Sequence, residues 1–482
     1  MRRRTLLQLP GAALAATQAA PPSGIADLGS RRELFVDRFL IDRLDGAELR
    51  LERPVEREQV LQLDRPWEGA FSAYFTVIRD GGGFHLYYRG VPNAGADGRG
   101  DEVTCYAHSP DGVRWKRPSL GLYTVRGERD NNVILAQDPP FSHNFCPFLD
   151  RRPGVPADER FKALAGTMPS GLAGFVSADG VHWKRLSGGP LLPPATAAAY
   201  DSQNLAFWSE MEQQYVCYFR TFRRVPGMGN VRWISRTVSP DFRKWEPGRE
   251  MDFGDAPPEH LYTNQTSPYY RAPHLYVSIA ARFMPGRQVI SDTEAKAIGV
   301  HPQYFKDCAD GVLLTSRGGW RYERTFLEGF LRPGPGIENW VSRDNYPALN
   351  VVETGPAEMS FYVNRHYGQP SSHLSRYTLR TDGFASVAAP YRGGSMTTRS
   401  FRFSGSRLEL NYATSAAGFV RVELLDPDGA RVAESVELIG DRSDRVVAWK
   451  DESNIGRFAG RPVRMRLALK DAQVFSFRFQ GA

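Results

Sequence analysis

Four carboxylate side chains stand just before strand-like segments, where two of them together can carry out acid–base chemistry. They are Glu68 in PWEGAF, Asp201 in AYDSQN, Glu259 in PPEHLYTN and Asp344 in SRDNYP. Breaking a glycosidic bond usually needs two carboxyl groups beside the bond, one protonated and one ionised. We expect Asp201 and Glu259 to form this pair, with the longer Glu259 as the acid and Glu68 as a supporting carboxylate. Taken singly, each is more simply explained as a solvated loop charge, and only their recurrence at equivalent positions favours a site.

Asparagines recur at similar places before the strand-like segments. These amides are Asn144, Asn204, Asn264 and Asn345. A ring of amides around an axis can bind a sugar, a water molecule or an ion. The same residues are also favoured as caps of the turns that lead into strands. The sequence leaves both interpretations open.

Cationic and aromatic residues lie close to the same positions. His143 and Arg343 occupy matching places in the second and fifth repeats described below, where they can hold sugar hydroxyls or the carboxylate of an acidic sugar. A structural hydrogen bond across the axis explains them equally well. Trp67, Trp340 and Tyr262 can stack on sugar rings, or they can pack in the core.

The elements that must position these residues are marked by a repeated turn. SPDGVRWKRP covers residues 109–118 and SADGVHWKRL covers residues 177–186. Weaker copies follow, so that the turns centre on positions 111, 179, 241, 318 and 382, which are 62 to 77 residues apart. Asp-Gly between two β-rich runs is a strong turn signal. Five copies at one period indicate a repeat architecture.

Each interval between turns contains strand-like runs, such as YFTVIRD followed by GFHLYYRG. A third strand leads into the turn and a fourth follows it. Four antiparallel strands repeated five times, without a convincing helix, predict an all-β fold with a five-bladed β-propeller over residues 30–390. The turn then joins the third and fourth strands of each blade, and its tryptophan packs between blades. We expect ELFVDRFLI, residues 33–41, to close the ring by joining the last blade.

The two ends of the chain differ from the repeats. Residues 392–482 alternate apolar and polar residues with short turns, which predicts a separate jelly-roll-like β-sandwich. Residues 1–20 combine Arg2–Arg4, a short apolar stretch and small residues, which is typical of an export signal, with Arg3-Arg4 resembling a twin-arginine signal. A disordered basic tail is the alternative. We expect an exported protein, periplasmic or extracellular.

Composition excludes several partners. The formal charge of +7 is spread along the chain without a basic stripe between aromatic residues, so nucleic acid is not an expected partner. No later segment is apolar over the roughly 18 residues that a membrane span needs. The four cysteines form no CxxC or Cys/His cluster, so we expect buried strand residues and no zinc. We expect no cofactor, although a propeller funnel lined by oxygen atoms can hold a calcium ion.

A five-bladed propeller followed by a β-sandwich on an exported chain resembles the furanosidase-type glycoside hydrolases. The segments ELFVDRFLIDRLDG, HNFCPFLD, YDSQN and LYTNQTSP look like those of secreted bacterial proteins similar to glycoside hydrolase family 32. The resemblance covers nearly the whole mature chain and is one of layout. The family motifs Asn-Asp-Pro-Asn-Gly, Arg-Asp-Pro and Glu-Cys do not occur, so catalytic residues cannot be transferred from it.

The resemblance and the carboxylates together predict a secreted glycoside hydrolase that acts on a poly- or oligosaccharide. Two alternatives remain open at this point. One is a propeller that binds carbohydrate without turnover, and the other is a glycoside phosphorylase, which needs a basic pocket for phosphate.

Overall fold

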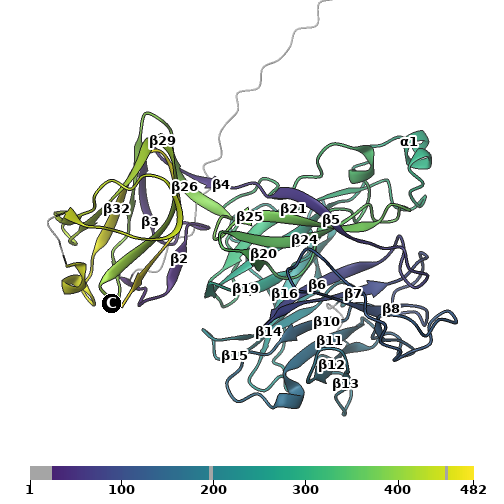
Figure 1. Ribbon diagram of the computed structural model, residues 1–482. Coiled ribbons are helices and arrows are strands. Elements are labelled where there is room, and N and C mark those ends of the chain that lie inside the picture. Colours follow the sequence, from purple (N-terminus) through teal and green to yellow (C-terminus); the bar gives the residue numbers. More distant parts are fainter. Residues whose placement is uncertain (1–23, 195–198, 451–453, 482) are drawn as a thin grey trace, which may run out of the picture.

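The computed structural model describes residues 24–194, 199–450 and 454–481. The expected export signal over residues 1–20 lies outside this part of the chain. Among the described residues, no helix is long and apolar enough to cross a membrane. Figure 1 shows two bodies built of strands, a larger one of five sheets and a smaller one that contains the C-terminus. The predicted five-bladed β-propeller followed by a β-sandwich is confirmed.

The first three blades each have four antiparallel strands in sequence order. Blade one contains β6 (Ala73–Asp80), β7 (Gly83–Gly90), β8 (Val103–Ser109) and β9 (Val133–Leu135). Blade two contains β10 (Cys146–Leu149), β11 (Phe161–Thr167), β12 (Gly171–Ser177) and β13 (Lys184–Arg185). Blade three contains β14 (Leu205–Ser209), β15 (Gln214–Val225), β16 (Gly229–Ser239) and β17 (Arg249–Glu250).

In the last two blades, two short strands share the innermost position. In blade four, β18 (His260–Thr263) and β19 (Thr266–Tyr269) both pair with β20 (Ala272–Met284), which pairs with β21 (Cys308–Ser316). In blade five, β22 (Tyr346–Pro347) and β23 (Val352–Gly355) both pair with β24 (Glu358–Arg365), which pairs with β25 (His373–Arg380). The only α-helix of the described chain, α1 (Asp292–Ala297), lies in the excursion between β20 and β21.

The ring is closed by a strand from near the N-terminus. β5 (Val55–Gln62) pairs with β25 as the outermost strand of blade five. The prediction that residues 33–41 close the ring is therefore wrong, since β2 (Arg32–Leu34) pairs with β32 of the sandwich. The sequence VEREQVLQ of β5 is mostly polar because an outer edge strand faces water, so hydrophobic alternation does not reveal it.

The repeated turns join the third and fourth strands, as predicted, in the first three blades. In each of them the aspartate Oδ1 accepts from the backbone N–H groups of the residues two and three positions later, as Asp179 does from Val181 and His182. The turn tryptophan also packs against the preceding blade, with Trp183 edge-on to Tyr87. The fifth turn differs because the strand after it, β26 (Ala385–Ala389), belongs to the sandwich.

The sandwich combines both ends of the chain. Its two longest strands, β29 (Arg407–Leu425) and β32 (Arg464–Gln480), pair along their length with a shift between Thr414 and Phe419. The remaining strands are β1 (Ala26–Asp27), β2, β3 (Ile41–Asp45), β4 (Glu48–Leu51), β26, β27 (Gly394–Thr398), β28 (Phe401–Arg402), β30 (Arg431–Glu434) and β31 (Asp441–Val446). The propeller therefore begins at β5 rather than at residue 30, and the sandwich includes residues 26–51 and β26.

Two buried glutamines fill the axis of the propeller. Gln203 of blade three donates to Thr76 Oγ1 of blade one at 2.7 Å, and Gln265 of blade four donates to Gln203 Oε1 and to the Pro347 carbonyl of blade five, both at 2.7 Å. These bonds link four blades near the start of their inner strands. We call the end where the inner strands begin the N-terminal face and the end where they finish the C-terminal face.

Candidate active site

Asp201 lies at the N-terminal face, just before the inner strand of blade three, as the sequence predicts. Its side chain is 35% exposed and pairs with Arg220, whose Nε donates to Asp201 Oδ1 at 2.7 Å. Arg220 lies on the long strand β15 beyond the last residue paired with β14. Asp201 is therefore a charged group that solvent can reach and that a buried guanidinium holds in place.

Tyr262 on β18 is the centre of a cationic cluster at the same face. The guanidinium carbons of Arg220, Arg232 and Arg343 lie 4.2, 4.9 and 5.5 Å from the centre of its ring. Burial alone would raise the pKa of the Tyr262 phenol, but the charges of Arg343, Arg220 and Arg232 outweigh it and lower this pKa below the ordinary value of 10.0. Tyr262 is thus a phenol suited to proton transfer closer to neutral pH.

The backbone around this cluster is strained. Residues with a left-handed φ are Tyr74 (60°), Tyr200 (48°), Gln265 (52°) and Arg343 (60°). Such conformations cost about 1–3 kcal/mol each for residues other than glycine and gather at functional sites. Their grouping around Tyr262 marks this region as a candidate functional site.

Glu259 lies in a different ion-pair cluster from Asp201. Its Oε1 accepts from Arg282 Nη1 at 2.8 Å, and its Oε2 accepts from Arg324 Nη1 at 2.7 Å. Arg282 also pairs with Asp310. Both carboxylate oxygens of Glu259 are therefore engaged with arginines of blade four and its following loop, whereas Asp201 pairs with an arginine of blade three.

Glu68 and Trp67 lie inside the protein, away from the place expected for them. The Glu68 side chain has no exposed surface, and its carboxylate accepts from Tyr88 and from both Arg117 Nε and Nη2 at 2.9 Å. Burial raises the pKa of Glu68, although Arg117 opposes this effect. Trp67 is 6% exposed and donates its Nε1 to Asn132 at 2.8 Å. These contacts leave neither side chain facing a substrate.

The recurring asparagines act as caps of the turns before the inner strands, one of the two interpretations that the sequence leaves open. Asn144 and Asn204 both donate to the carbonyls of Tyr200 and Ser202. Asn264 accepts from the Thr266 N–H at 3.1 Å. All three side chains are buried. Asn144 and Asn204 therefore support the loop that carries Asp201, and Asn264 caps the turn between β18 and β19.

His143 and Trp340 also make contacts within the protein. The buried His143 ring shares a hydrogen bond of 2.8 Å with Glu102, and Arg89 Nη1 lies 3.4 Å from the same nitrogen. Trp340 donates to the Gly334 carbonyl and packs beside Val341 under the excursion that contains α1. Arg343 differs from both, since its guanidinium lies over Tyr262 and Tyr304 with no hydrogen bond within the described chain.

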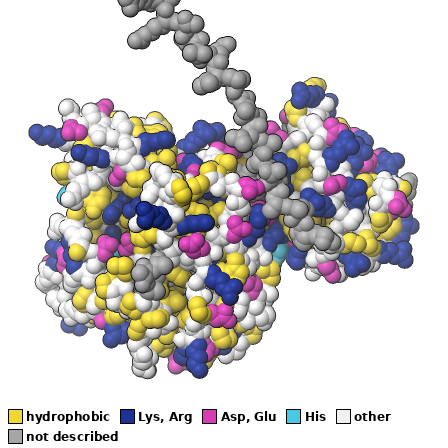
Figure 2. All heavy atoms as spheres, turned by 180° about the vertical axis from the view of Figure 1, so that it is seen from behind, with side chains coloured by type: hydrophobic (Ala, Val, Ile, Leu, Met, Phe, Trp, Pro, Cys, Tyr) yellow, Lys and Arg dark blue, Asp and Glu magenta, His cyan; other side chains and the backbone are white. Residues whose placement is uncertain are grey.

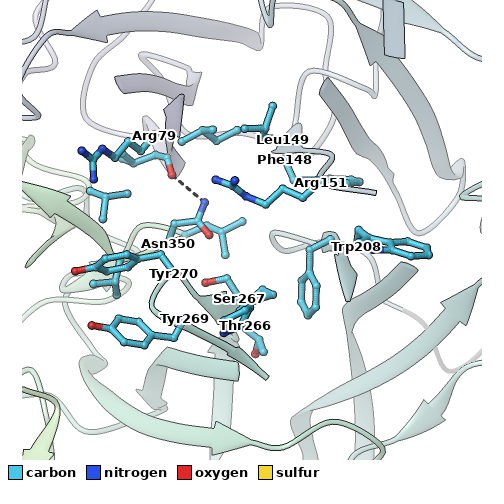
Figure 3. Close-up of a pocket in the computed structure, with 18 of the residues that line it drawn as sticks. Arg79, Phe148, Leu149, Arg151, Trp208, Thr266, Ser267, Tyr269, Tyr270 and Asn350 are labelled. Atoms are coloured by element: carbon cyan, nitrogen blue, oxygen red, sulfur yellow. Dashed lines mark hydrogen bonds between the residues drawn. The ribbon is translucent and has the colours of Figure 1, made fainter. Parts of the chain in front are cut away.

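A separate cavity of about 460 Å³ opens at the C-terminal face. Figure 3 shows Arg79, Arg151, Trp208, Tyr270 and Asn350 around it, with Asn350 donating to the Val77 carbonyl at 2.8 Å. No motif identified in the sequence points to this cavity. Its carboxylates are Glu210 and Glu353, and Glu353 pairs with Arg79. The glutamines Gln203 and Gln265 lie between it and the Tyr262 cluster.

Within residues 24–194, 199–450 and 454–481, no group of three or more His, Cys, Asp or Glu side chains is arranged to hold a metal ion. The four cysteines are buried and unpaired, as expected of strand residues. On the face seen in Figure 2, basic and acidic side chains are interspersed.

The residues missed by sequence reasoning are Tyr74, Arg220 and Arg232, and Tyr262 was recognised only as an aromatic. A signal for the arginines exists in the unusual length of QQYVCYFRTFRRVPGMGNVRWISRTVS, which forms strands of 12 and 11 residues. The hairpin of β15 and β16 is longer than the inner strand β14, so its far end extends past β14 at the N-terminal face. Arg220 and Arg232 lie in this projecting part, where Arg220 is opposite Ile234 and Arg232 is opposite Phe222.

No model of a known protein family matches the chain, and no curated protein matches its sequence. Solved structures do resemble its fold. An arabinoxylan arabinofuranohydrolase of glycoside hydrolase family 43 from Bacillus subtilis is 12% identical, with a TM-score of 0.39 over 87% of this chain and 98% of that chain. A fructofuranosidase from Schwanniomyces occidentalis is 10% identical, with a TM-score of 0.39 over 89% and 100%. An N-acetylgalactosamine deacetylase from F. plautii is 13% identical, with a TM-score of 0.42 over 70% and 96%.

Proposed function

We propose that this protein is an exported glycoside hydrolase whose site lies at the N-terminal face of the propeller. The observation that carries the proposal is the cluster of Asp201, Arg220 and Tyr262. It places one charged, solvent-accessible carboxylate and one phenol of lowered pKa around the same buried arginine. The fold itself supports many activities and does not decide between them.

In the proposed reaction, Asp201 is the base and Tyr262 is the proton donor. Asp201 takes a proton from water while the water oxygen forms a bond to the anomeric carbon. The glycosidic C–O bond breaks, and its oxygen takes the Tyr262 proton. The neighbouring guanidinium groups stabilise the phenolate that results, and transfer of a proton from Asp201 through solvent restores both groups. One water is consumed and two sugar hydroxyls are formed. A donor is most effective when its pKa lies near the working pH.

This assignment keeps Asp201 from the sequence-based hypothesis and replaces Glu259 by Tyr262. Glu259 is held by Arg282 and Arg324 through both oxygens, so protonating it would break two ion pairs. The phenol of Tyr262 makes no hydrogen bond within the described chain and is free to donate to a leaving group.

The test is sugar release from a panel of glycans by the full chain, with and without phosphate. We expect Asp201→Asn and Tyr262→Phe each to lower kcat by about 10²- to 10⁴-fold, which is the usual contribution of acid–base catalysis, with little change in Tm. Glu259→Gln is the comparison and should retain most of the activity.

Other outcomes point elsewhere. Loss of activity in Glu259→Gln but not in Tyr262→Phe would support Asp201 and Glu259 as the catalytic pair, as the sequence predicts. Cleavage that requires phosphate would identify a glycoside phosphorylase, which the cationic character of the cluster favours as the second candidate. Binding to glycans without any turnover would identify a carbohydrate-binding propeller.

A further inference from the structure

The cluster around Tyr262 has more positive than negative charge. Arg220, Arg232 and Arg343 surround the ring, and among the described residues Asp201 is the only carboxylate paired with any of them. Arg232 and Arg343 make no ion pair within the described part of the chain. The tyrosines beside them, Tyr304 and Tyr346, supply ring faces and hydroxyls but no full charge.

Several polar atoms in this cluster also lack a partner. Arg220 is 3% exposed, and its Nη1 forms no hydrogen bond to any described residue. The same is true of Arg232 Nε and of the buried Tyr346 hydroxyl. A buried charged donor without an acceptor is costly, and a bound anion is one way to supply the missing acceptor. Three donors around one ring therefore form an incomplete binding site.

The backbone strain at Arg343 is an independent observation that also supports a binding site. Its φ of 60° holds a bulky residue in the left-handed region, between two further residues of the same loop that are buried. The result is a guanidinium placed over Tyr262 and Tyr304, at 5.5 and 5.0 Å from their ring centres. Backbone strain of this kind is retained when the side chain position matters.

We infer that Arg220, Arg232 and Arg343 bind an oxyanion during the reaction, and that this anion is the carboxylate of an acidic sugar unit. Guanidinium groups bind carboxylates through two parallel hydrogen bonds, which gives both affinity and orientation. A free phosphate offers the same chemistry, and the experiment below separates the two sources. This acidic-sugar site rests on the proposed function for its location at the N-terminal face. It adds the chemical class of the substrate.

The test measures binding rather than turnover. The full chain is titrated by calorimetry with D-glucuronate and D-galacturonate, with the neutral methyl ester of each acid, and with inorganic phosphate. We expect at least one of the acids to bind and its ester to bind about 10- to 100-fold more weakly. Arg343→Gln and Arg232→Gln should each weaken binding of the acid by a similar factor and leave the ester unchanged. Arg343→Lys, which keeps the charge but loses the paired donors, should fall between.

Arg151→Gln is the matched control, because Arg151 is an exposed cation in the cavity of the opposite face and has no ion pair to any residue that the structure describes. It should bind the acid as the unchanged protein does. Equal binding of acid and ester, no binding of either acid or phosphate, or loss of binding in Arg151→Gln alone would overturn the inference. Binding of phosphate alone, lost in Arg343→Gln, would support an oxyanion site but overturn its assignment to an acidic sugar. Intact binding of an acid without cleavage of any glycan would contradict the proposed hydrolase but not this site.

Discussion

The guanidinium carbon of Arg220 lies 4.2 Å from the centre of the Tyr262 ring. The two residues come from neighbouring blades, since Arg220 is on β15 and Tyr262 is on β18. The same arginine donates to Asp201, so one buried cation contacts both groups that we assign to acid–base chemistry. The protonation state of Tyr262 therefore depends on the charges around it.

The first prediction concerns the pH dependence of kcat/KM. As proton donor, Tyr262 must be protonated, so activity falls as pH rises through its pKa, which is lowered below 10.0. Arg343→Gln removes one of the charges that lower this pKa. We expect the basic limb of the profile to move to higher pH in Arg343→Gln, and to disappear in Tyr262→Phe, with activity measured on a neutral substrate. A basic limb that stays in place in both variants would rule out Tyr262 as the titrating group.

The architecture could be predicted from the sequence because the repeated turn encodes its own geometry. In the copies at Asp111, Asp179 and Asp241, the carboxylate caps the N–H groups that follow and the tryptophan Nε1 donates back into the turn. These contacts are local, so their residues recur at fixed spacing. The closing strand β5 and the sandwich strands β1–β4 could not be predicted in this way, because their partners lie more than 300 residues away.

The site could be predicted only in part for a related reason. Asp201 is positioned by its place before an inner strand, which periodicity reveals. Glu68 stands at a similar place in its repeat, yet it is buried against Arg117 and Tyr88. Whether a loop side chain points into the protein or toward solvent depends on the residues that the tertiary structure brings next to it. Arg343 was predicted from its place before an inner strand, whereas Arg220 and Arg232 were missed because they lie on the hairpin of blade three and reach Tyr262 of blade four only in the folded ring.

The second prediction tests the packing of the repeated turn. Gly180 has a φ of +77°, and a Cβ there would lie 2.4 Å from the hydroxyl of Tyr87 in the preceding blade. Gly180→Ala should therefore lower the free energy of unfolding by about 3 kcal/mol, from the left-handed backbone and the clash together. Gly154 is the control in the same blade, with a φ of +74° and no atom within 4 Å. Gly154→Ala should cost about 1–2 kcal/mol in urea unfolding. Equal losses would show that the turn does not pack against Tyr87 as described.

The third prediction concerns Asp344, which is completely buried beside the site. Burial raises its pKa to about 6, although Arg365 opposes this effect. A raised pKa in the folded state means that the stability from this group is present below the unfolded value of 3.8 and is lost as pH rises through about 6. Between pH 5 and 7.5 the unchanged protein should lose about 1 kcal/mol from this group. Asp344→Asn should lack that loss, so the difference in unfolding free energy between the two proteins should change with pH in this interval. A constant difference would contradict the raised pKa.

The last prediction concerns the junction between sandwich and propeller. Glu33 on β2 of the sandwich is 1% exposed, and it accepts from Arg317 of blade four at 2.9 Å and lies 3.1 Å from His274 of the same blade. Burial would raise the pKa of Glu33, but Arg317 and His274 outweigh it and hold this pKa well below its ordinary value of 4.5. Its contribution to stability is therefore present above pH 4.5 and is lost as pH falls below that value.

Glu33→Gln removes the charge from this buried group while keeping its shape. Arg317 then retains only Asp37 as a carboxylate partner, and His274 loses its acceptor charge. Breaking one member of a buried charged network costs about 3 kcal/mol or more. The control is Glu48→Gln on β4, because Glu48 is 61% exposed and its surface pair with Arg50 is worth at most about 1 kcal/mol. Urea unfolding at pH 7 should give a clearly lower midpoint for Glu33→Gln than for Glu48→Gln. At pH 3.5 the midpoints of Glu33→Gln and the unchanged protein should still differ, since the pKa of Glu33 lies below that pH. Midpoints that already coincide at pH 3.5 would show that Arg317 and His274 do not hold the carboxylate as described.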